Sequence, residues 1–293
     1  MESNNIDKVE SITVYTLLDD YAGYETSFYG QHGIAFLLEV IAGDERKRVL
    51  FDTGQSGQPI LDNMEKLRVN PKDIDLVFLS HCHYDHTGGL IAMLKAIDKP
   101  VPVIAHPKIF RRNLVKDQNW RHVGLGATKE EISKFGAEWI LDNHPRKLVE
   151  GVTTTGEIIQ EDKVEFEKEL TSHLYTMENG KMVNDTMVDD MSLVIETRGG
   201  LVVVSGCSHA GIVSIVRKAI QVAGNKRVKA VVGGYHLIDA KKERLEQTVT
   251  ILKKLGVEKM YAGHCTGLKA ECAFINEFGE NFEKLHSGKV VEF

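Results

Sequence analysis

One stretch decides the fold of this chain: Ser80-His81-Cys82-His83-Tyr84-Asp85-His86-Thr87-Gly88-Gly89. It follows the mostly apolar run 75–79, which has the length and the polar flanks of a buried strand. A polar loop after such a strand presents its side chains at the edge of a sheet, where a cleft can form. Three histidines and one aspartate lie within six positions of this loop, at His81, His83, Asp85 and His86.

These four side chains are suited to binding metal ions. Residues i and i+2 of an extended chain point the same way, so His81 and His83 can bind one ion while Cys82 faces elsewhere. Asp85 and His86 lie where the chain turns toward a helix, and they can reach a second ion. Imidazole and carboxylate at this density favour zinc, with manganese and iron as alternatives. A polar turn with coincidental histidines is the other interpretation, but chance rarely produces this density.

The pattern His-x-His-x-Asp-His after an apolar strand resembles the signature of the metallo-β-lactamase superfamily. The resemblance to the superfamily extends to further motifs at other predicted strand ends: Phe51-Asp52-Thr53-Gly54, Gly206-Cys207-Ser208-His209, Gly233-Gly234-Tyr235-His236 and Gly263-His264-Cys265-Thr266-Gly267. Together the motifs span most of the chain. Their combination is similar to the branch of the superfamily named for dihydropterin ribofuranosyl-aminobenzene phosphate synthase. The resemblance implies a two-metal site in an α/β fold.

The alternation of strands and helices predicts a layered α/β core. With the resemblance, it predicts a metallo-β-lactamase-like four-layer αββα sandwich built from residues 1–105 and 191–293. The range 106–190 has short elements, scattered charges and a hairpin signal at Asn179-Gly180. We expect this range to form an inserted small α+β subdomain that covers the site.

The other strand ends supply further candidate site residues. His209 lies at a strand end beside a helix N-terminus, where the helix dipole favours anions, and we expect it to bind metal rather than to cap the helix. His264 is expected to be the last metal ligand. Asp52 is expected to orient a metal-bound histidine, with an Asx turn as the alternative. Six side chains already suffice for two ions: His81, His83, Asp85, His86, His209 and His264. We therefore expect His236 to contact the substrate rather than a metal ion. Asp85 and His236 are the residues that we expect to be catalytic.

One position departs from the superfamily pattern. Many members have a bridging aspartate just after the strand that ends here at Gly206, and this chain has Cys207. A thiolate binds zinc well, but the side chain can also point into the core as a small apolar group. Whether Cys207 bridges two ions is therefore left open. The alternative bridging carboxylates lie before the predicted strand that starts at Ser192, at Asp185, Asp189 and Asp190.

Two further features are less specific. The long loop 19–33 is rich in Asp, Gly, Tyr and Ser, and either contacts the substrate or is a surface excursion. The remaining histidines of the middle region are interpreted as ordinary surface or packing residues rather than ligands: His106, His122, His144 and His173.

Composition limits the partners. The chain has 293 residues, 42% of them hydrophobic, and a net charge of −6 without a dense basic block, so we expect no nucleic-acid partner. Neither a signal peptide nor a long apolar run is apparent, so we expect no membrane partner. The four cysteines lack a disulfide framework spacing and indicate a reducing cytoplasm. Association into a homo-oligomer is compatible with this composition.

A paired metal centre lowers the pKa of a bound water and holds it as hydroxide. The first hypothesis is therefore a metallohydrolase that uses a metal-bound hydroxide on a small phosphorylated or ester-like metabolite, which we expect to be an anion. The alternative implied by the resemblance is a dihydropterin diphosphate-dependent transferase that forms a C–N bond. A non-catalytic metal-binding module is the third. A di-iron redox protein is disfavoured, because His83 stands where such proteins tend to have glutamate.

Overall fold

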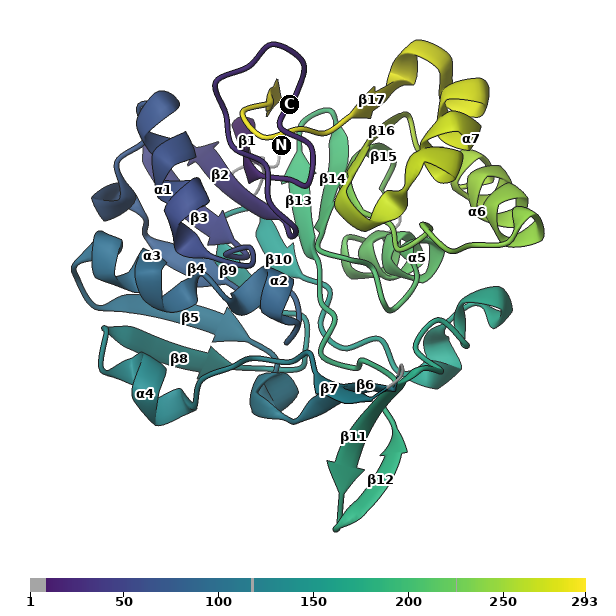
Figure 1. Cartoon of the computed structure of the whole chain (residues 1–293). Helices are drawn as coiled ribbons and strands as arrows, with labels where there is room; N and C mark the ends of the chain where they lie inside the picture. Colours follow the sequence, from purple (N-terminus) through teal and green to yellow (C-terminus); the bar gives the residue numbers. More distant parts are fainter. Residues whose placement is uncertain (1–8, 117–118, 225) are drawn as a thin grey trace, which may run out of the picture.

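The computed structural model describes residues 9–116, 119–224 and 226–293 (Figure 1). The N-terminal stretch that we expected to lack a targeting signal lies outside these ranges. Two seven-stranded sheets and one four-stranded sheet make up the β-structure of the described residues. None of the helices in these ranges has the length and apolar character needed to cross a membrane.

The first large sheet has the order β18-β1-β2-β3-β4-β5-β8. Its first three pairings are antiparallel and its last three are parallel. Its strands are β1 (Ser11–Leu18), β2 (Ala35–Ala42), β3 (Glu45–Phe51), β4 (Leu76–Phe78), β5 (Val101–Ala105), β8 (Ala137–Leu141) and β18 (Val290–Glu292).

The second large sheet has the order β17-β16-β15-β14-β13-β10-β9, with three parallel pairings followed by three antiparallel ones. Its strands are β9 (Lys147–Val149), β10 (Val152–Thr154), β13 (Leu193–Thr197), β14 (Gly200–Ser205), β15 (Val228–Gly234), β16 (Lys259–Gly263) and β17 (Phe282–Lys284). Both sheets thus combine an antiparallel half with a parallel half, whose strand ends meet near the centre of the molecule (Figure 1).

Alternating apolar residues bury both faces of each sheet. In β2, Phe36 and Leu38 join the core between the sheets, whereas Leu37 joins the core under the outer helices. In β14, Val202 packs between the sheets and Val203 packs outward. This pattern leaves each sheet covered on both sides, as the near-continuous apolar strands require.

Helices form the two outer layers. The first sheet is covered by α1 (Gly57–Lys66), α3 (Leu90–Ile97) and α4 (Lys129–Ser133), and the second by α5 (Ile212–Val222), α6 (Lys242–Lys254) and α7 (Leu268–Phe278). The predicted four-layer αββα arrangement is confirmed (Figure 1). The short helices are α2 (Tyr84–Thr87), η1 (Pro71–Asp73), η2 (Pro107–Phe110), η3 (Gln160–Asp162), η4 (Glu165–Glu167), η5 (His264–Thr266) and η6 (Gly279–Asn281).

The middle region contributes to all three sheets. The small antiparallel sheet takes β6 (Asn113–Lys116), β7 (Trp120–His122), β11 (Leu174–Glu178) and β12 (Lys181–Asn184). The predicted hairpin at Asn179-Gly180 joins β11 to β12 and projects from the body of the molecule (Figure 1). Strands β8, β9 and β10 also fall in the range 106–190, but they extend the large sheets. Only part of the range that we expected to be inserted therefore lies outside the core sheets.

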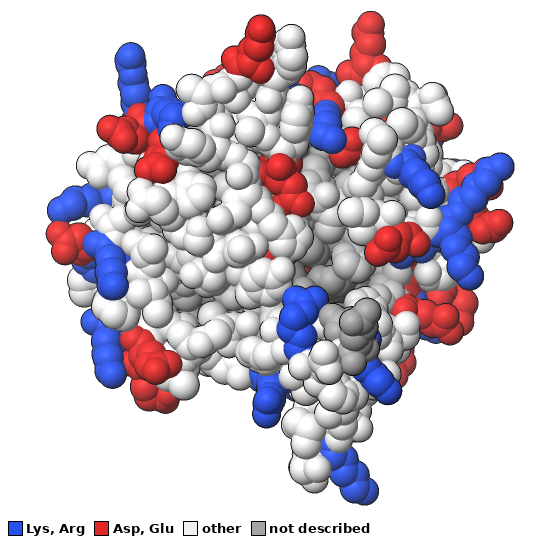
Figure 2. Space-filling model, viewed as in Figure 1, with Lys and Arg blue, Asp and Glu red and all other residues white. Residues whose placement is uncertain are grey.

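Charged side chains of both signs are interspersed around the rim of the face shown in Figure 2, and the face is hollowed near its centre. The hollow lies between the two halves of the molecule, where the loops after the parallel strands converge (Figure 1). This arrangement matches the general rule that ligands of open α/β sheets bind beyond the carboxyl ends of the strands.

A buried carboxylate holds the helix that follows His209. Glu167 accepts hydrogen bonds at Oε1 from the backbone N–H of Val213 and at Oε2 from that of Ser214, each at 2.9 Å. The Ser214 hydroxyl donates to the same Oε2 at 2.6 Å. The anion expected at this helix N-terminus is therefore supplied by the protein itself, and it satisfies backbone donors that the helix leaves free.

Replacing this carboxylate should destabilise the fold. In Glu167→Ala, the N–H groups of Val213 and Ser214 lose their partner while buried, so we expect the free energy of unfolding to fall by about 2–4 kcal/mol. Urea denaturation of the full chain measures it. The exposed neighbour Glu161 is the control: Glu161→Ala should change stability by less than about 0.5 kcal/mol. Equal stability of the two variants would contradict the capping role of Glu167.

Candidate metal centre

The loops after the central strands bring the candidate metal-binding side chains close together. Four residues in these loops have left-handed backbone angles: Asp52 (φ 57°), Ser208 (φ 63°), His236 (φ 47°) and His264 (φ 49°). Such angles are uncommon outside glycine and cluster at functional sites, where the surrounding structure holds them. Each sits just after a strand, so the chain turns sharply and directs polar side chains toward the centre.

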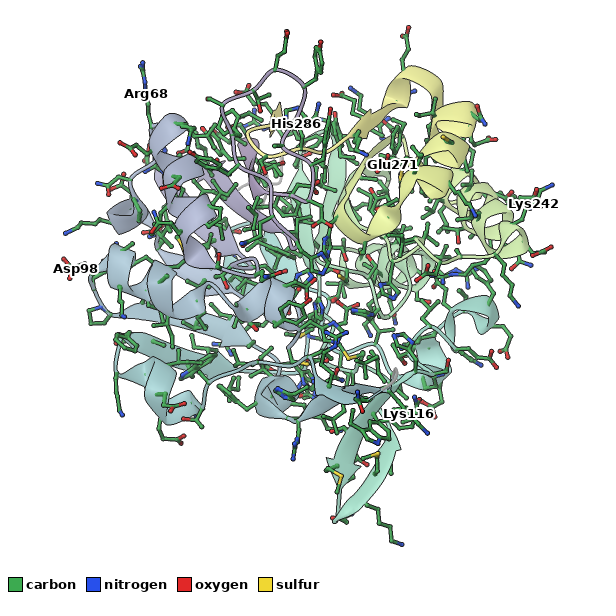
Figure 3. All side chains as sticks on the ribbon, in the orientation of Figure 1. Arg68, Asp98, Lys116, Lys242, Glu271 and His286 are labelled. Atoms are coloured by element: carbon green, nitrogen blue, oxygen red, sulfur yellow. The ribbon has the colours of Figure 1, made fainter. Side chains whose placement is uncertain are left out.

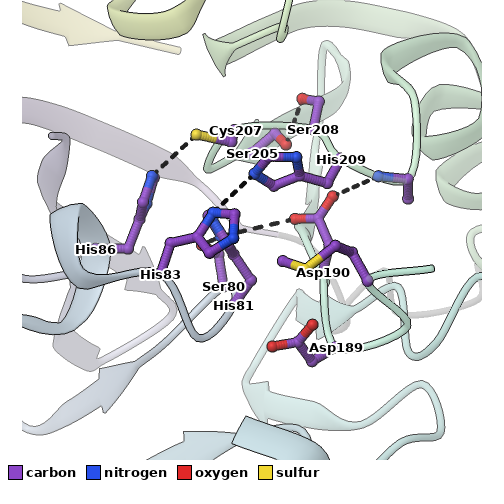
Figure 4. A network of polar contacts seen from close by, with 12 residues as sticks. Ser80, His81, His83, His86, Asp189, Asp190, Ser205, Cys207, Ser208 and His209 are labelled. Carbon is purple, nitrogen blue, oxygen red and sulfur yellow. Dashed lines mark hydrogen bonds and ion pairs between the residues drawn. The ribbon is translucent and has the colours of Figure 1, made fainter. Parts of the chain in front are cut away.

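Three buried histidines form a first cluster. His81 Nε2 lies 3.2 Å from His83 Nδ1, and His209 Nε2 lies 3.0 Å from the same atom (Figure 4). Ligand atoms arranged tetrahedrally around zinc, at the usual bond length, lie about 3.3 Å apart. The cluster therefore has the dimensions of a three-histidine site with one open position.

A second buried cluster lies beside the first and contains Asp85, His86, Cys207 and His264. His86 Nε2 lies 3.0 Å and His264 Nε2 lies 3.2 Å from Cys207 Sγ. Asp85 Oδ2 lies 3.2 Å from His264 Nε2. This donor set, with two imidazoles, one carboxylate and one thiol, also fits a tetrahedral divalent ion.

The sulfur of Cys207 lies between the two clusters. Besides belonging to the second cluster, it lies within 4.8 Å of ligand atoms of His209 and His236. The side chain faces the site and not the apolar core. The two clusters together are consistent with a binuclear metal site, and Cys207 is placed where it could bridge the ions.

The carboxylates considered as alternatives lie elsewhere. Asp185 pairs with Arg111, and Asp189 accepts hydrogen bonds from Arg111 and from the N–H of Cys82. Asp190 accepts from the N–H of Ala210, with its Oδ1 4.0 Å from His81 Nδ1 (Figure 4). All three support the loops from outside the two clusters. None of them joins a candidate ligand group among the described residues, so this geometry favours Cys207 over these carboxylates for the bridging position.

Asp52 occupies the position expected of an orienting residue. Its Oδ2 lies 2.6 Å from His86 Nδ1, which donates to it and so leaves Nε2 free to face the second cluster. Two other residues contact candidate ligand histidines in the same way, and the sequence analysis did not predict them. Asp20 Oδ1 lies 3.0 Å from His264 Nδ1, and Asn113 Oδ1 lies 3.1 Å from His83 Nε2. Neither carries a local sequence signal beyond its residue type.

The first cluster favours neutral imidazoles. Burial, reinforced by neighbouring histidines, keeps the pKa of His81 and of His209 well below the usual value, and burial lowers that of His83 to about 4. Neutral rings keep their lone pairs available for a cation. In the second cluster, burial alone would raise the pKa of Asp85, but His86 and His264 outweigh it and lower the pKa strongly. A carboxylate ligand is thus held ionised.

A cavity of about 260 Å³ adjoins both clusters. The loop 19–33 contributes Asp20 and His32 to its lining, and the small sheet contributes Arg121 from β7. His236 also lines it, in keeping with the predicted role toward substrate. His173 was interpreted as an ordinary histidine, but the structure places it in the lining as well.

Metal binding should depend on His83, whose Nδ1 lies between the other two rings of the first cluster. We expect His83→Ala to lose about one equivalent of bound metal, because two histidines alone bind zinc weakly. Elemental analysis of the purified chain measures this, with the exposed His144→Ala as the control. Full metal occupancy in His83→Ala would show that the ligand assignment is wrong.

Cys207 gives a second, independent test. Cys207→Ala removes a donor from the second cluster, so the variant should bind about one metal equivalent fewer than wild type. Cys207→Asp restores a ligand that can bridge and should recover most of the lost metal. If both variants keep the wild-type metal content, Cys207 does not contribute to metal binding.

Comparison with known proteins agrees with this geometry. The sequence pattern of the Metallo-beta-lactamase superfamily matches residues 35–264. The chain is 50% identical, over 99% of both chains, to 7,8-dihydropterin-6-methyl-4-(β-D-ribofuranosyl)-aminobenzene-5′-phosphate synthase of Methanocaldococcus jannaschii. An uncharacterised protein of the same organism is 30% identical over 94% of this chain and 98% of its own.

Among solved structures, a metal-dependent hydrolase of the β-lactamase superfamily superposes with a TM-score of 0.79 at 28% identity, covering 96% of this chain and 99% of that one. The strand-end motifs, the two ligand clusters and these similarities lead to one assignment. This chain belongs to the metallo-β-lactamase superfamily.

Proposed function

We propose that this enzyme joins a dihydropterin, activated as the diphosphate ester of its 6-methyl alcohol, to 4-(β-D-ribofuranosyl)aminobenzene 5′-phosphate. The observation that carries the proposal is the 50% identity to the Methanocaldococcus jannaschii synthase over 99% of both chains. The hydrolysis that we first expected has weaker support, because the structure named as a hydrolase is only 28% identical. A non-catalytic module is not supported, since nearly the whole length of the chain matches a named enzyme at 50% identity.

The reaction places defined demands on the site. A C–N bond forms between the aromatic amine and the 6-methyl carbon, the C–O bond to diphosphate breaks, and the amine loses a proton.

We propose zinc for both metal positions, because a thiol among imidazoles favours zinc over harder ions, with manganese and iron as alternatives. Divalent ions held there would bind the diphosphate oxygens and neutralise the charge of the leaving group.

The chain's own residues complete the proposed site. His236 lines the cavity, and its ring lies 4.2 Å, centre to centre, from that of His209. Its Nδ1 is buried without a hydrogen-bond partner among the described residues, so it is free to accept a proton or a hydrogen bond from a substrate. Asp85 keeps its carboxylate directed at the second cluster, where it helps to set the position of the reacting group.

The proposed activity is tested by incubating the metal-loaded chain with both substrates and following the coupled product and diphosphate by chromatography. We expect coupling that depends on the amine. Asp85→Asn keeps the shape of the side chain but weakens its interactions, so it should fold and turn over at least about 100-fold more slowly. Diphosphate release that is independent of the amine, without coupled product, would instead support a hydrolase.

His236 is predicted to act on substrate and not to hold metal. We expect His236→Ala to keep the wild-type metal content while kcat/KM falls by about 10–100-fold, as for loss of a group that transfers a proton. Steady-state kinetics and elemental analysis on one preparation measure both quantities. Loss of a metal equivalent in this variant would make His236 a ligand, which its position near Cys207 and His209 allows geometrically.

A further inference from the structure

A second cavity, of about 450 Å³, adjoins the one at the metal centre. The two share three lining residues, His173, His236 and Ile238. The second cavity lies between the segment around η4 and the start of α6, where Lys242 is labelled in Figure 3. A ligand whose reacting group lies at the metal centre can therefore extend past His236 into this space.

The second cavity contains an arginine that forms no ion pair within the part of the chain that the structure describes. Arg244, in the first turn of α6, is half-buried and lines the cavity. Its Nη2 donates to the backbone oxygen of His236 at 2.7 Å. Its Nε is shielded from solvent and has no hydrogen-bond partner among the described residues. Within those residues it also forms no ion pair, whereas the comparably buried Arg111 pairs with two aspartates.

The acidic groups near Arg244 are already engaged or solvated. Glu167 and Cys265 act on it electrostatically, but the Glu167 carboxylate accepts its hydrogen bonds from the start of α5. The carboxylates in the cavity lining, Glu169 and Asp239, are solvent-exposed. A partly buried cation that lacks a partner is costly, so an anion entering the cavity would gain a charge-assisted hydrogen bond at little desolvation cost.

We propose that this cavity binds a phosphate monoester of the substrate, remote from the reacting bond, and that Arg244 contacts that phosphate. The inference rests on the proposed function. The product in the name of the Methanocaldococcus jannaschii relative carries a 5′-phosphate on its ribofuranosyl group. That phosphate lies at the opposite end of the aminobenzene from the new C–N bond. One end of the amine substrate then lies at the metals and the other at Arg244.

A binding experiment tests the site without relying on turnover. Ribose 5-phosphate and ribose are titrated calorimetrically into the metal-loaded full chain. We expect the phosphate to bind and ribose not to. Arg244→Gln should weaken phosphate binding by about tenfold or more, and Arg244→Lys by less. The exposed Arg217→Gln is the matched control and should bind like wild type. Undetectable binding to wild type, or equal affinity of wild type and Arg244→Gln at equal metal content, overturns the proposal.

A kinetic experiment assigns the site to the amine substrate. With the 5′-phosphorylated amine, Arg244→Gln should raise KM by about tenfold, whereas the dephosphorylated amine should show similar KM values for wild type and variant. An equal effect on both amines overturns the assignment. If wild type couples neither amine, the proposed function fails, and the calorimetric comparison still decides whether Arg244 binds a phosphate.

Discussion

The buried carboxylate of Asp52 connects the parts of the structure on which the site depends. Its Oδ1 accepts from the N–H of Ser80 at 2.7 Å, while Oδ2 accepts from the Ser80 hydroxyl at 2.7 Å and faces His86 Nδ1 at 2.6 Å. One group therefore ties the end of β3 to the loop after β4 and orients a ligand ring. The second sheet approaches the same point through Gly206, where a Cβ would lie only 2.3 Å from the Ser80 hydroxyl.

Neither half of the molecule completes a ligand cluster alone. The loop after β4 supplies two histidines to the first cluster, and His209 from the second half completes it. The same loop supplies Asp85 and His86 to the second cluster, which Cys207 and His264 complete from the second half. Bound ions would therefore cross-link the two halves, and metal binding would add directly to the stability of the folded state. Without a cation, seven polar side chains remain buried at this seam.

In the proposed reaction, the two cavities have different roles: the first holds the reacting groups and the second holds the remote phosphate. Residues of both clusters line the first cavity, and His173, His236 and Ile238 line both this cavity and the second, where Arg244 lies. Besides the loops that carry the clustered side chains, the loop 19–33, the small sheet, the segment 166–173 and the start of α6 line this path. The superfamily core can thus keep its ligand geometry while loops and helix ends set the substrate, as in other folds whose sites sit at strand ends.

The sequence alone predicted a layered α/β core and the dense group of candidate ligands after one strand, because both signals are local. With the family resemblance, it predicted six of the seven side chains that the structure gathers into the two clusters. Strand and helix periods are short, and His81, His83, Asp85 and His86 occupy one strand end and one helical turn. The direction of the Cys207 side chain was decided only by the tertiary structure. So were the contact of Asp20 with His264, 244 positions away, and the lack of a hydrogen-bond partner for Arg244 Nε among the described residues. Such properties depend on which chain segments pack together, and no local spacing encodes that.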